Sequence, residues 1–235
     1  MFLKFVVVLA YLTVAVQGAC SWASGDTILI SDGALSIPPS VTTITQSELA
    51  DCVGIESVVI PTTVTSIGAS AFNGKGALAT LTFETGSSLT SIGEDAFRET
   101  AIASVEIPAS VTSIGNNAFN GIAELTSLTF ETGSSLTSIG ERAFRSTQIT
   151  SVVIPASVTS IGDDAFYINR ALTSLTFETG SSLTSIGESA FYEAAITSVV
   201  FPASVISIGE NAFYDNAALT SLTFENESEL LTIGE

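Results

Sequence analysis

Short runs in which apolar residues alternate with small polar residues recur along most of the chain. In the run from Ser151 to Ile154, the second and fourth residues are the apolar Val152 and Ile154. A strand places successive side chains on opposite sides, so this run predicts a short strand that buries one side and exposes the other. The inward pair is apolar in the other copies as well: Val58 and Ile60, Leu81 and Phe83, Val105 and Ile107, Leu128 and Phe130, Leu222 and Phe224.

A second pattern, Ile-Gly-x-x-Ala-Phe, follows the predicted strands and defines an internal repeat. Its spacing is 25 residues from Phe72 to Phe97 and 22 residues from Phe97 to Phe119, and this alternation continues, so the full period is 47 residues. One half-unit reads SVVIPASVTSIGDDAFYINRAL (151–172), and the other reads SLTFETGSSLTSIGESAFYEAAI (174–196). The phenylalanines of this pattern are Phe72, Phe97, Phe119, Phe144, Phe166, Phe191 and Phe213.

A single half-unit is too small to bury its apolar side, so neighbouring units must stack. The pattern therefore predicts a repeat solenoid with short parallel strands on one face and short helical turns or loops on the other. Proline closes the strand in every second unit, as at Pro155, because it cannot extend the ladder. We expect the Ala-Phe segment to begin a helical turn, whose start would favour acidic residues such as Asp163 and Glu188.

The segments ITSVVIPASVTSIGDDAF (149–166) and LTSLTF…LTSIGERAF (125–144) resemble the leucine-rich repeats of the BspA-like, or Treponema pallidum-type, family. The resemblance covers about residues 37–235. It implies a leucine-rich-repeat fold and a role in adhesion or recognition, because the family is linked to attachment of microbes to hosts and to extracellular matrix proteins.

The N-terminal part of the chain departs from the repeat. Residues 1–18 combine an early lysine with an apolar run, which predicts a secretory signal peptide and hence a secreted or cell-surface protein. No later segment is long and apolar enough to predict a membrane span. Residues 19–53 are predicted to form an N-terminal cap with a degenerate first repeat, a hairpin at Asp32-Gly33 and one disulfide between Cys20 and Cys52.

The solenoid is expected to occupy residues 54–235, and its last unit stops at LLTIGE, before the Ala-Phe pair. Terminal units of a solenoid usually carry a polar end that protects the core. Two explanations stay open: the chain is a fragment of a longer protein, or its uncapped end associates with another chain.

Charge and composition disfavour several classes of function. The chain has 6 Lys and Arg against 24 Asp and Glu, a net charge of −18, which disfavours binding to nucleic acid. It has no histidine, the commonest general base and metal ligand, and its serines have no recognisable base partner, so we expect no enzyme, no cofactor and no metal site. Calcium at Glu131 is the alternative to a solvated acidic ridge, but carboxylates one period apart should lie about 10 Å apart.

The outward residues of the predicted strands form the candidate recognition face. They are small, hydroxylated and nearly uncharged, whereas Glu84, Glu131, Glu178 and Glu225 recur on the link after the strand. Three interpretations compete: a copied structural surface without a dedicated site, recognition of an extracellular protein or glycan, and ice or mineral binding by the hydroxyl array. The candidate residues are Ser104, Glu106, Ser127, Thr129, Ser151, Val153, Ser174, Thr176, Ser198 and Val200, with Asn226 as a glycosylation acceptor if the host is a eukaryote.

Overall fold

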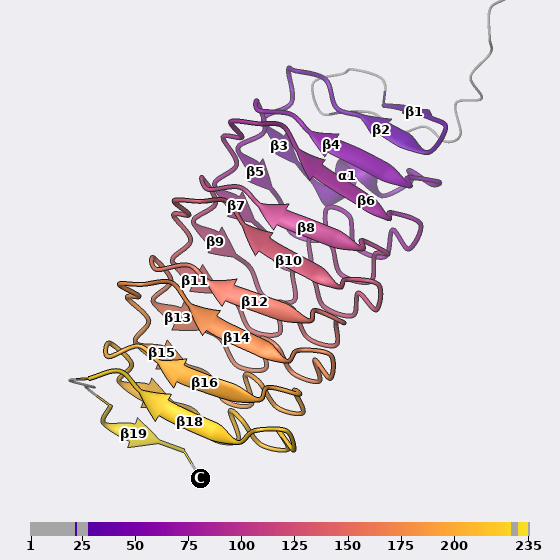
Figure 1. Ribbon diagram of the computed structural model, residues 1–235. Helices are drawn as coiled ribbons and strands as arrows, with labels where there is room; N and C mark the ends of the chain where they lie inside the picture. Colours follow the sequence, from indigo (N-terminus) through magenta and orange to yellow (C-terminus); the bar gives the residue numbers. More distant parts are fainter. Residues whose placement is uncertain (1–21, 23–27, 227–229, 235) are drawn as a thin grey trace, which may run out of the picture.

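The computed structural model describes Trp22, residues 28–226 and residues 230–234, and these form one elongated stack of coils (Figure 1). The predicted signal peptide (1–18) and Cys20 lie outside the described residues. Within the described part of the chain, no helix has the length and apolar character needed to cross a bilayer.

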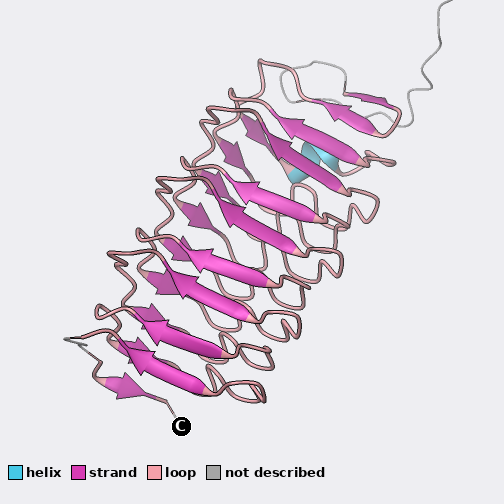
Figure 2. Cartoon of the chain, in the orientation of Figure 1, coloured by secondary structure: helices cyan, strands magenta, loops and turns pink. Residues whose placement is uncertain are grey.

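One side of the stack consists of the predicted four-residue strands, which run parallel to one another (Figure 2). Neighbouring copies pair residue for residue, so Ser104 lies opposite Ser127 and Ser151 lies opposite Ser174. The strands join in pairs, β4 with β6, β8 with β10, β12 with β14 and β16 with β18. Their bounds are β4 Ser57–Ile60, β6 Thr80–Phe83, β8 Ser104–Ile107, β10 Ser127–Phe130, β12 Ser151–Ile154, β14 Ser174–Phe177, β16 Ser198–Phe201 and β18 Ser221–Phe224.

A second sheet, which the sequence pattern does not predict, lies behind the first. It is built from the two residues before the Gly of each unit, or before Thr45 in the degenerate first unit, and its nine strands form one continuous parallel sheet. The bounds are β3 Thr43–Ile44, β5 Ser66–Ile67, β7 Ser91–Ile92, β9 Ser113–Ile114, β11 Ser138–Ile139, β13 Ser160–Ile161, β15 Ser185–Ile186, β17 Ser207–Ile208 and β19 Thr232–Ile233.

Glycine follows most of these short strands because the coils come too close for a side chain. A Cβ built at Gly140 would lie 2.6 Å from the carbonyl carbon of Gly115 and 2.7 Å from the backbone nitrogen of Asn116. These neighbours are backbone atoms, which cannot rotate away. The close approach of two coils therefore excludes larger residues at this position.

The Ala-Phe segments form tight turns, not the helical turns that we expected. The second residue after the Gly adopts a left-handed backbone conformation, as at Asn117 (φ 55°) and Asp164 (φ 54°), and this ends any helical progression. The amide N–H of Phe119 donates to the carbonyl of Ala143 in the next coil at 2.8 Å. The only helix of the described residues is α1 (Gln46–Leu49), in the degenerate first unit.

The backbone bonds that the turn phenylalanines donate all run in one direction along the stack. In each coil the N–H of the turn Phe donates to the carbonyl of the turn Ala in the following coil. The pairs are Phe72 with Ala96, Phe97 with Ala118, Phe119 with Ala143, Phe144 with Ala165, Phe166 with Ala190 and Phe191 with Ala212, at 2.7–2.8 Å.

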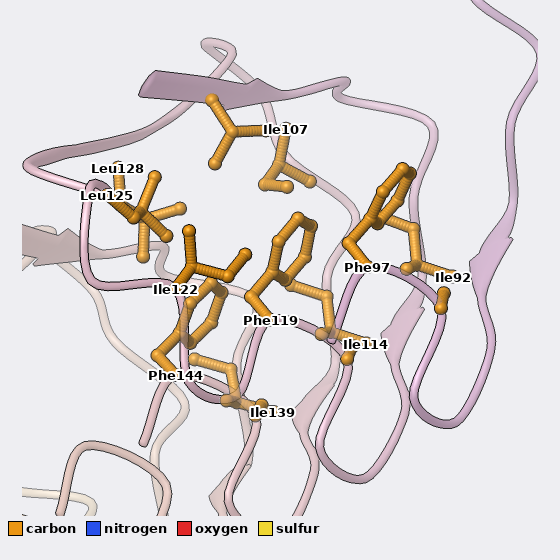
Figure 3. Packing of buried hydrophobic residues seen from close by; sticks show 14 of the residues in the cluster. Ile92, Phe97, Ile107, Ile114, Phe119, Ile122, Leu125, Leu128, Ile139 and Phe144 are labelled. Carbon is orange, nitrogen blue, oxygen red and sulfur yellow. The ribbon is translucent and has the colours of Figure 1, made fainter. Parts of the chain in front are cut away.

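The phenylalanines of the repeat form a stacked column inside the solenoid (Figure 3). Consecutive rings from Phe72 to Phe213 are nearly parallel, with centroids 5.1–5.3 Å apart. Ile114 and Ile139 of the second sheet belong to the same core. Burial of an aromatic side chain contributes about 1.5–3 kcal/mol, and each favourable ring pair adds about 0.5–1.5 kcal/mol.

Two buried asparagines on the turn side are satisfied to different degrees. Asn169 accepts hydrogen bonds at its Oδ1 from the backbone N–H and the hydroxyl of Thr147, at 2.9 and 2.6 Å. The equivalent Asn216 donates to Phe191 at 2.8 Å, but its Oδ1 is buried and has no partner among the described residues. Ala194 occupies the position that corresponds to Thr147, so the hydroxyl donor is missing there.

The predicted N-terminal hairpin is confirmed. Strand β1 (Leu29–Ser31) pairs antiparallel with β2 (Ala34–Ser36), and Asp32 and Gly33 both have positive φ, as a two-residue turn of this kind requires. Cys52 is buried, with 1% of its surface exposed, but its predicted partner Cys20 lies outside the described residues. The disulfide and the limits of the cap (19–53) therefore stay predictions.

Candidate recognition face on the long strands

The ten candidate residues lie together on the outward side of strands β8 to β16, which we call the strand face. All ten are exposed, and the strand pairing brings Glu106 beside Thr129 and Val153 beside Thr176. The long strands of this side run one above another in Figure 1. Val153 and Val200 keep 51% and 56% of their surface accessible, so this side offers apolar contact as well as hydroxyls.

None of the ten candidate side chains forms a hydrogen bond or an ion pair with another described residue. A second group of hydroxyls, which we call the threonine row, behaves differently. Each of these threonines precedes a short strand and donates its hydroxyl to the backbone carbonyl of the threonine one coil earlier, at 2.9–3.1 Å. The donors are Thr65, Thr90, Thr112, Thr137, Thr159 and Thr184.

Four glutamates continue the strand face beyond the ends of the strands. The N–H of Glu131 donates to the carbonyl of Ile107 at 2.9 Å, so the ladder extends one residue past β10. With a two-residue period, Glu131 then follows Ser127 and Thr129 on the same side. Glu84, Glu178 and Glu225 repeat this arrangement, with bonds of 2.9–3.0 Å, and we call the four residues the glutamate column.

Each member of the glutamate column also bonds to the preceding coil. The carboxylate Oε2 of Glu131 accepts the backbone N–H of Ala109, the residue that follows Pro108, at 2.9 Å. The corresponding distances are 3.0 Å from Glu84 to Thr62, 2.9 Å from Glu178 to Ala156 and 3.2 Å from Glu225 to Ala203. Sequence reasoning placed these residues on a link and missed this contact, although their return every 47 residues directly after a strand-ending Phe was a usable signal.

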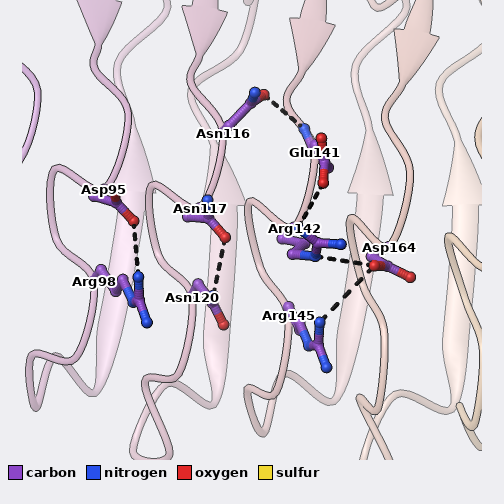
Figure 4. Close-up of polar contacts among 9 residues, drawn as sticks. All are labelled: Asp95, Arg98, Asn116, Asn117, Asn120, Glu141, Arg142, Arg145 and Asp164. Atoms are coloured by element: carbon purple, nitrogen blue, oxygen red, sulfur yellow. Dashed lines mark hydrogen bonds and ion pairs between the residues drawn. The ribbon is translucent and has the colours of Figure 1, made fainter.

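We call the residues between each short strand and the next long strand the turn segments. In contrast to the strand face, they carry charges of both signs (Figure 4). Arg142 pairs with Asp164 at 3.0 Å and with Glu141 at 2.7 Å. Arg145 lies 3.9 Å from Asp164 and stacks over the Tyr167 ring at 4.7 Å. These turns therefore carry both signs of charge in close contact.

Three tyrosines form an outer stack on the last turns. The ring centroids of Tyr167 and Tyr192 lie 4.8 Å apart, and those of Tyr192 and Tyr214 lie 5.2 Å apart. Each of these tyrosines directly follows a phenylalanine of the column in the sequence. Partial burial in this stack raises the pKa of Tyr192, and the neighbouring Tyr167 and Glu193 add to the rise. The stack extends the turn side and lies away from the ten candidate residues.

Two observations concern the calcium alternative at Glu131. The described residues contain no group of three or more His, Cys, Asp or Glu side chains that could hold a metal ion. The Oε2 atom of Glu131 is already bound to the N–H of Ala109. Asn226 is exposed, but the other two positions of its glycosylation sequence, 227 and 228, lie outside the described residues.

Comparison with known proteins supports the fold and the repeat type. No curated protein matches the chain. A leucine-rich repeat protein from Bacteroides ovatus is similar in structure, with a TM-score of 0.59 and 22% identity over 86% of this chain and 65% of that one. The pneumococcal vaccine antigen PcpA is similar with a TM-score of 0.50 and 20% identity, over 76% of this chain and 67% of that one.

This chain therefore spans about two thirds of the length of each of these two structures. The pattern of the BspA type leucine rich repeat region matches residues 42–173 and 137–235, with six copies. Because these ranges cover most of the chain and coincide with the stacked coils, the protein belongs to the family of BspA type leucine-rich repeats.

Proposed function

We propose that the protein acts outside the cell, secreted or attached to a surface, and recognises a protein or glycan through the strand face without catalysing a reaction. One observation carries the proposal: ten exposed side chains stand in register on neighbouring strands and make no hydrogen bond or ion pair with another described residue. The polar groups of the threonine row, in contrast, are used to hold the coils together.

The chemistry of the strand face suits a macromolecular partner. Exposed valines such as Val153 offer apolar contact, and the serines beside them can both donate and accept hydrogen bonds. Solenoids bind extended partners along such surfaces, since the repeats align equivalent positions over a long distance. The location outside the cell is supported by the signal-peptide pattern of residues 1–18 and by the family.

The test is capture of extracellular proteins and glycans by the mature chain, which starts at Ala19. The variant to compare carries arginine at four strand-face positions: Ser127, Thr129, Ser151 and Ser174. A matched control carries arginine at the exposed turn-segment positions Ala123, Gln148, Ala217 and Ala218, so the change in net charge is the same.

A partner that is held by the native chain and by the control, and lost by the strand-face variant, supports the proposal. A partner that all three proteins hold equally would move the site away from the strand face. The ice-binding alternative has less in its favour: the first residue of every long strand is Ser or Thr, but Val59, Glu106, Val153 and Val200 interrupt the hydroxyls at the third residue. Ice shaping by the purified chain in a freezing assay would nevertheless replace our proposal.

A further inference from the structure

Resting on the proposed function, we propose that the partner of the strand face is a cationic, extended polypeptide segment whose Lys or Arg side chains meet the glutamate column.

The two signs of charge are segregated in the described residues. No Lys or Arg lies on the described long strands or in the glutamate column, whereas Glu106 and the four glutamates of the column are there. The five described basic residues all lie in turn segments: Lys75, Arg98, Arg142, Arg145 and Arg170. The strand face therefore presents only negative charge to a partner.

The basic residues are also occupied within the chain. The ammonium of Lys75 donates to the carbonyls of Leu49 and Cys52, both at 2.7 Å. The arginines pair with acidic neighbours: Arg98 with Asp95 and Glu99, Arg142 with Glu141 and Asp164, Arg145 with Asp164, and Arg170 with Glu193. The turn segments still hold more acidic than basic residues, among them Glu94, Glu188 and Glu210, so both sides of the stack are negative. The strand face differs because it has no basic residue of its own to compete with a cationic partner for its carboxylates.

The glutamate column is arranged to receive cations with little loss of side-chain freedom. In Glu84, Glu131 and Glu178, one carboxylate oxygen is held by a backbone N–H of the preceding coil, and the other has no partner among the described residues. A carboxylate that is already held in place loses less conformational entropy when a Lys or Arg binds to its free oxygen.

The spacing of the column suggests the form of the partner. Successive glutamates lie two strands apart, which corresponds to about 10 Å for strands spaced about 4.8 Å apart. A polyproline II segment has three residues per turn and rises about 3.1 Å per residue, so every third side chain returns on one side after about 9 Å. The exposed Val153 lies on the strand between those that lead to Glu131 and Glu178, level with Thr176 and two residues before the level of the glutamates, where it offers apolar contact beside the cations.

The experiment measures binding of two synthetic peptides by calorimetry or fluorescence anisotropy at low and moderate salt. One peptide is (Lys-Pro-Pro)4, and the other has the same composition with its four lysines adjacent. The strand-side variant replaces Glu84, Glu131 and Glu178 with Gln, which keeps an oxygen acceptor for the backbone N–H. The control replaces the exposed turn-segment residues Glu94, Glu188 and Glu210 with Gln, so both variants change net charge equally.

We expect the native chain to prefer the spaced peptide, and the strand-side variant to lose about tenfold in affinity, as three exposed ion pairs would give. The control variant should lose little. Equal losses in both variants, or no preference for the spaced peptide, would overturn the inference, because binding would then follow net charge alone. If the arginine variant at Ser127, Thr129, Ser151 and Ser174 loses its captured partner while the strand-side variant keeps it, the proposed function holds and the cationic partner is wrong.

Discussion

Threonines on two sides of the same coil have different roles. On the long strands, Thr129 and Thr176 point outward and bond to nothing within the described chain. Beside the short strands, Thr112 and Thr137 donate their hydroxyls to the coil before them at 3.0 and 2.9 Å. One side is therefore available to a partner, and the other holds neighbouring coils together, so stability and recognition can change independently.

The largest expected loss of stability is in the phenylalanine column. Replacement of the fully buried Phe119 by Ala should lower the free energy of unfolding by about 3–5 kcal/mol, because the cavity cannot close between two stacked rings. Thr129→Ala on the strand face should change it by less than about 0.5 kcal/mol. Chemical denaturation of both variants measures the difference, and similar losses would contradict the separation of the two sides.

A smaller effect is expected at the close approach of the coils. Gly140→Ala places a methyl group against the backbone of Gly115 and Asn116 and should cost about 1–3 kcal/mol by overpacking. Ser127→Ala, on the strand face, is the matched small change. A Gly140→Ala variant with the native midpoint of unfolding would show that the coils can separate without cost.

The two buried asparagines predict a substitution that should increase the stability of the fold. Ala194→Thr would supply Asn216 with the hydroxyl that Thr147 gives to Asn169, and it should stabilise the chain by about 1 kcal/mol. The gain should disappear when Asn216 is also replaced by Ala, which a double-mutant cycle measures. A gain that survives in the double variant would have another cause.

The smallest expected loss of stability is in the threonine row. Thr137→Val removes the hydroxyl that donates to Thr112 and should cost about 0.5 kcal/mol, since the bond is exposed. Thr129→Val on the strand face should be neutral or slightly stabilising, because valine favours strands. Equal costs in thermal unfolding would remove the distinction between the two kinds of threonine.

The sequence predicted the parts of the fold that have a readable period. Alternation over four residues located the long strands, and the return of Ala-Phe every 22 or 25 residues located the core column. The short strands were missed because two residues, such as Ser138 and Ile139, are too few to show any alternation. The turns were missed because their left-handed residues include Arg142 and Ile168, which have no preference for that conformation.

The candidate site was predictable only as a surface. The outward residues of the strands follow from the period, and the structure places all ten of them together. The separate roles of Thr129 and Thr137 could not be predicted, because a hydroxyl's partner depends on the distance between coils. The contact between Glu131 and Ala109 was hidden for the same reason, since its two residues are 22 positions apart.

The hydrogen bonds from each turn Phe to the Ala of the following coil align a row of peptide dipoles along the stack. Each turn Phe N–H points to the following coil, so these peptide dipoles add along the axis, with the positive end toward the C-terminal coils. Parallel sheets lack such a sum because their strand dipoles largely cancel. Lys75 in the first full turn and Glu210 and Asp215 in the last lie in the order that this field favours, so the row of Ala-Phe peptides resembles one long helix in its polarity although these peptides form no helix.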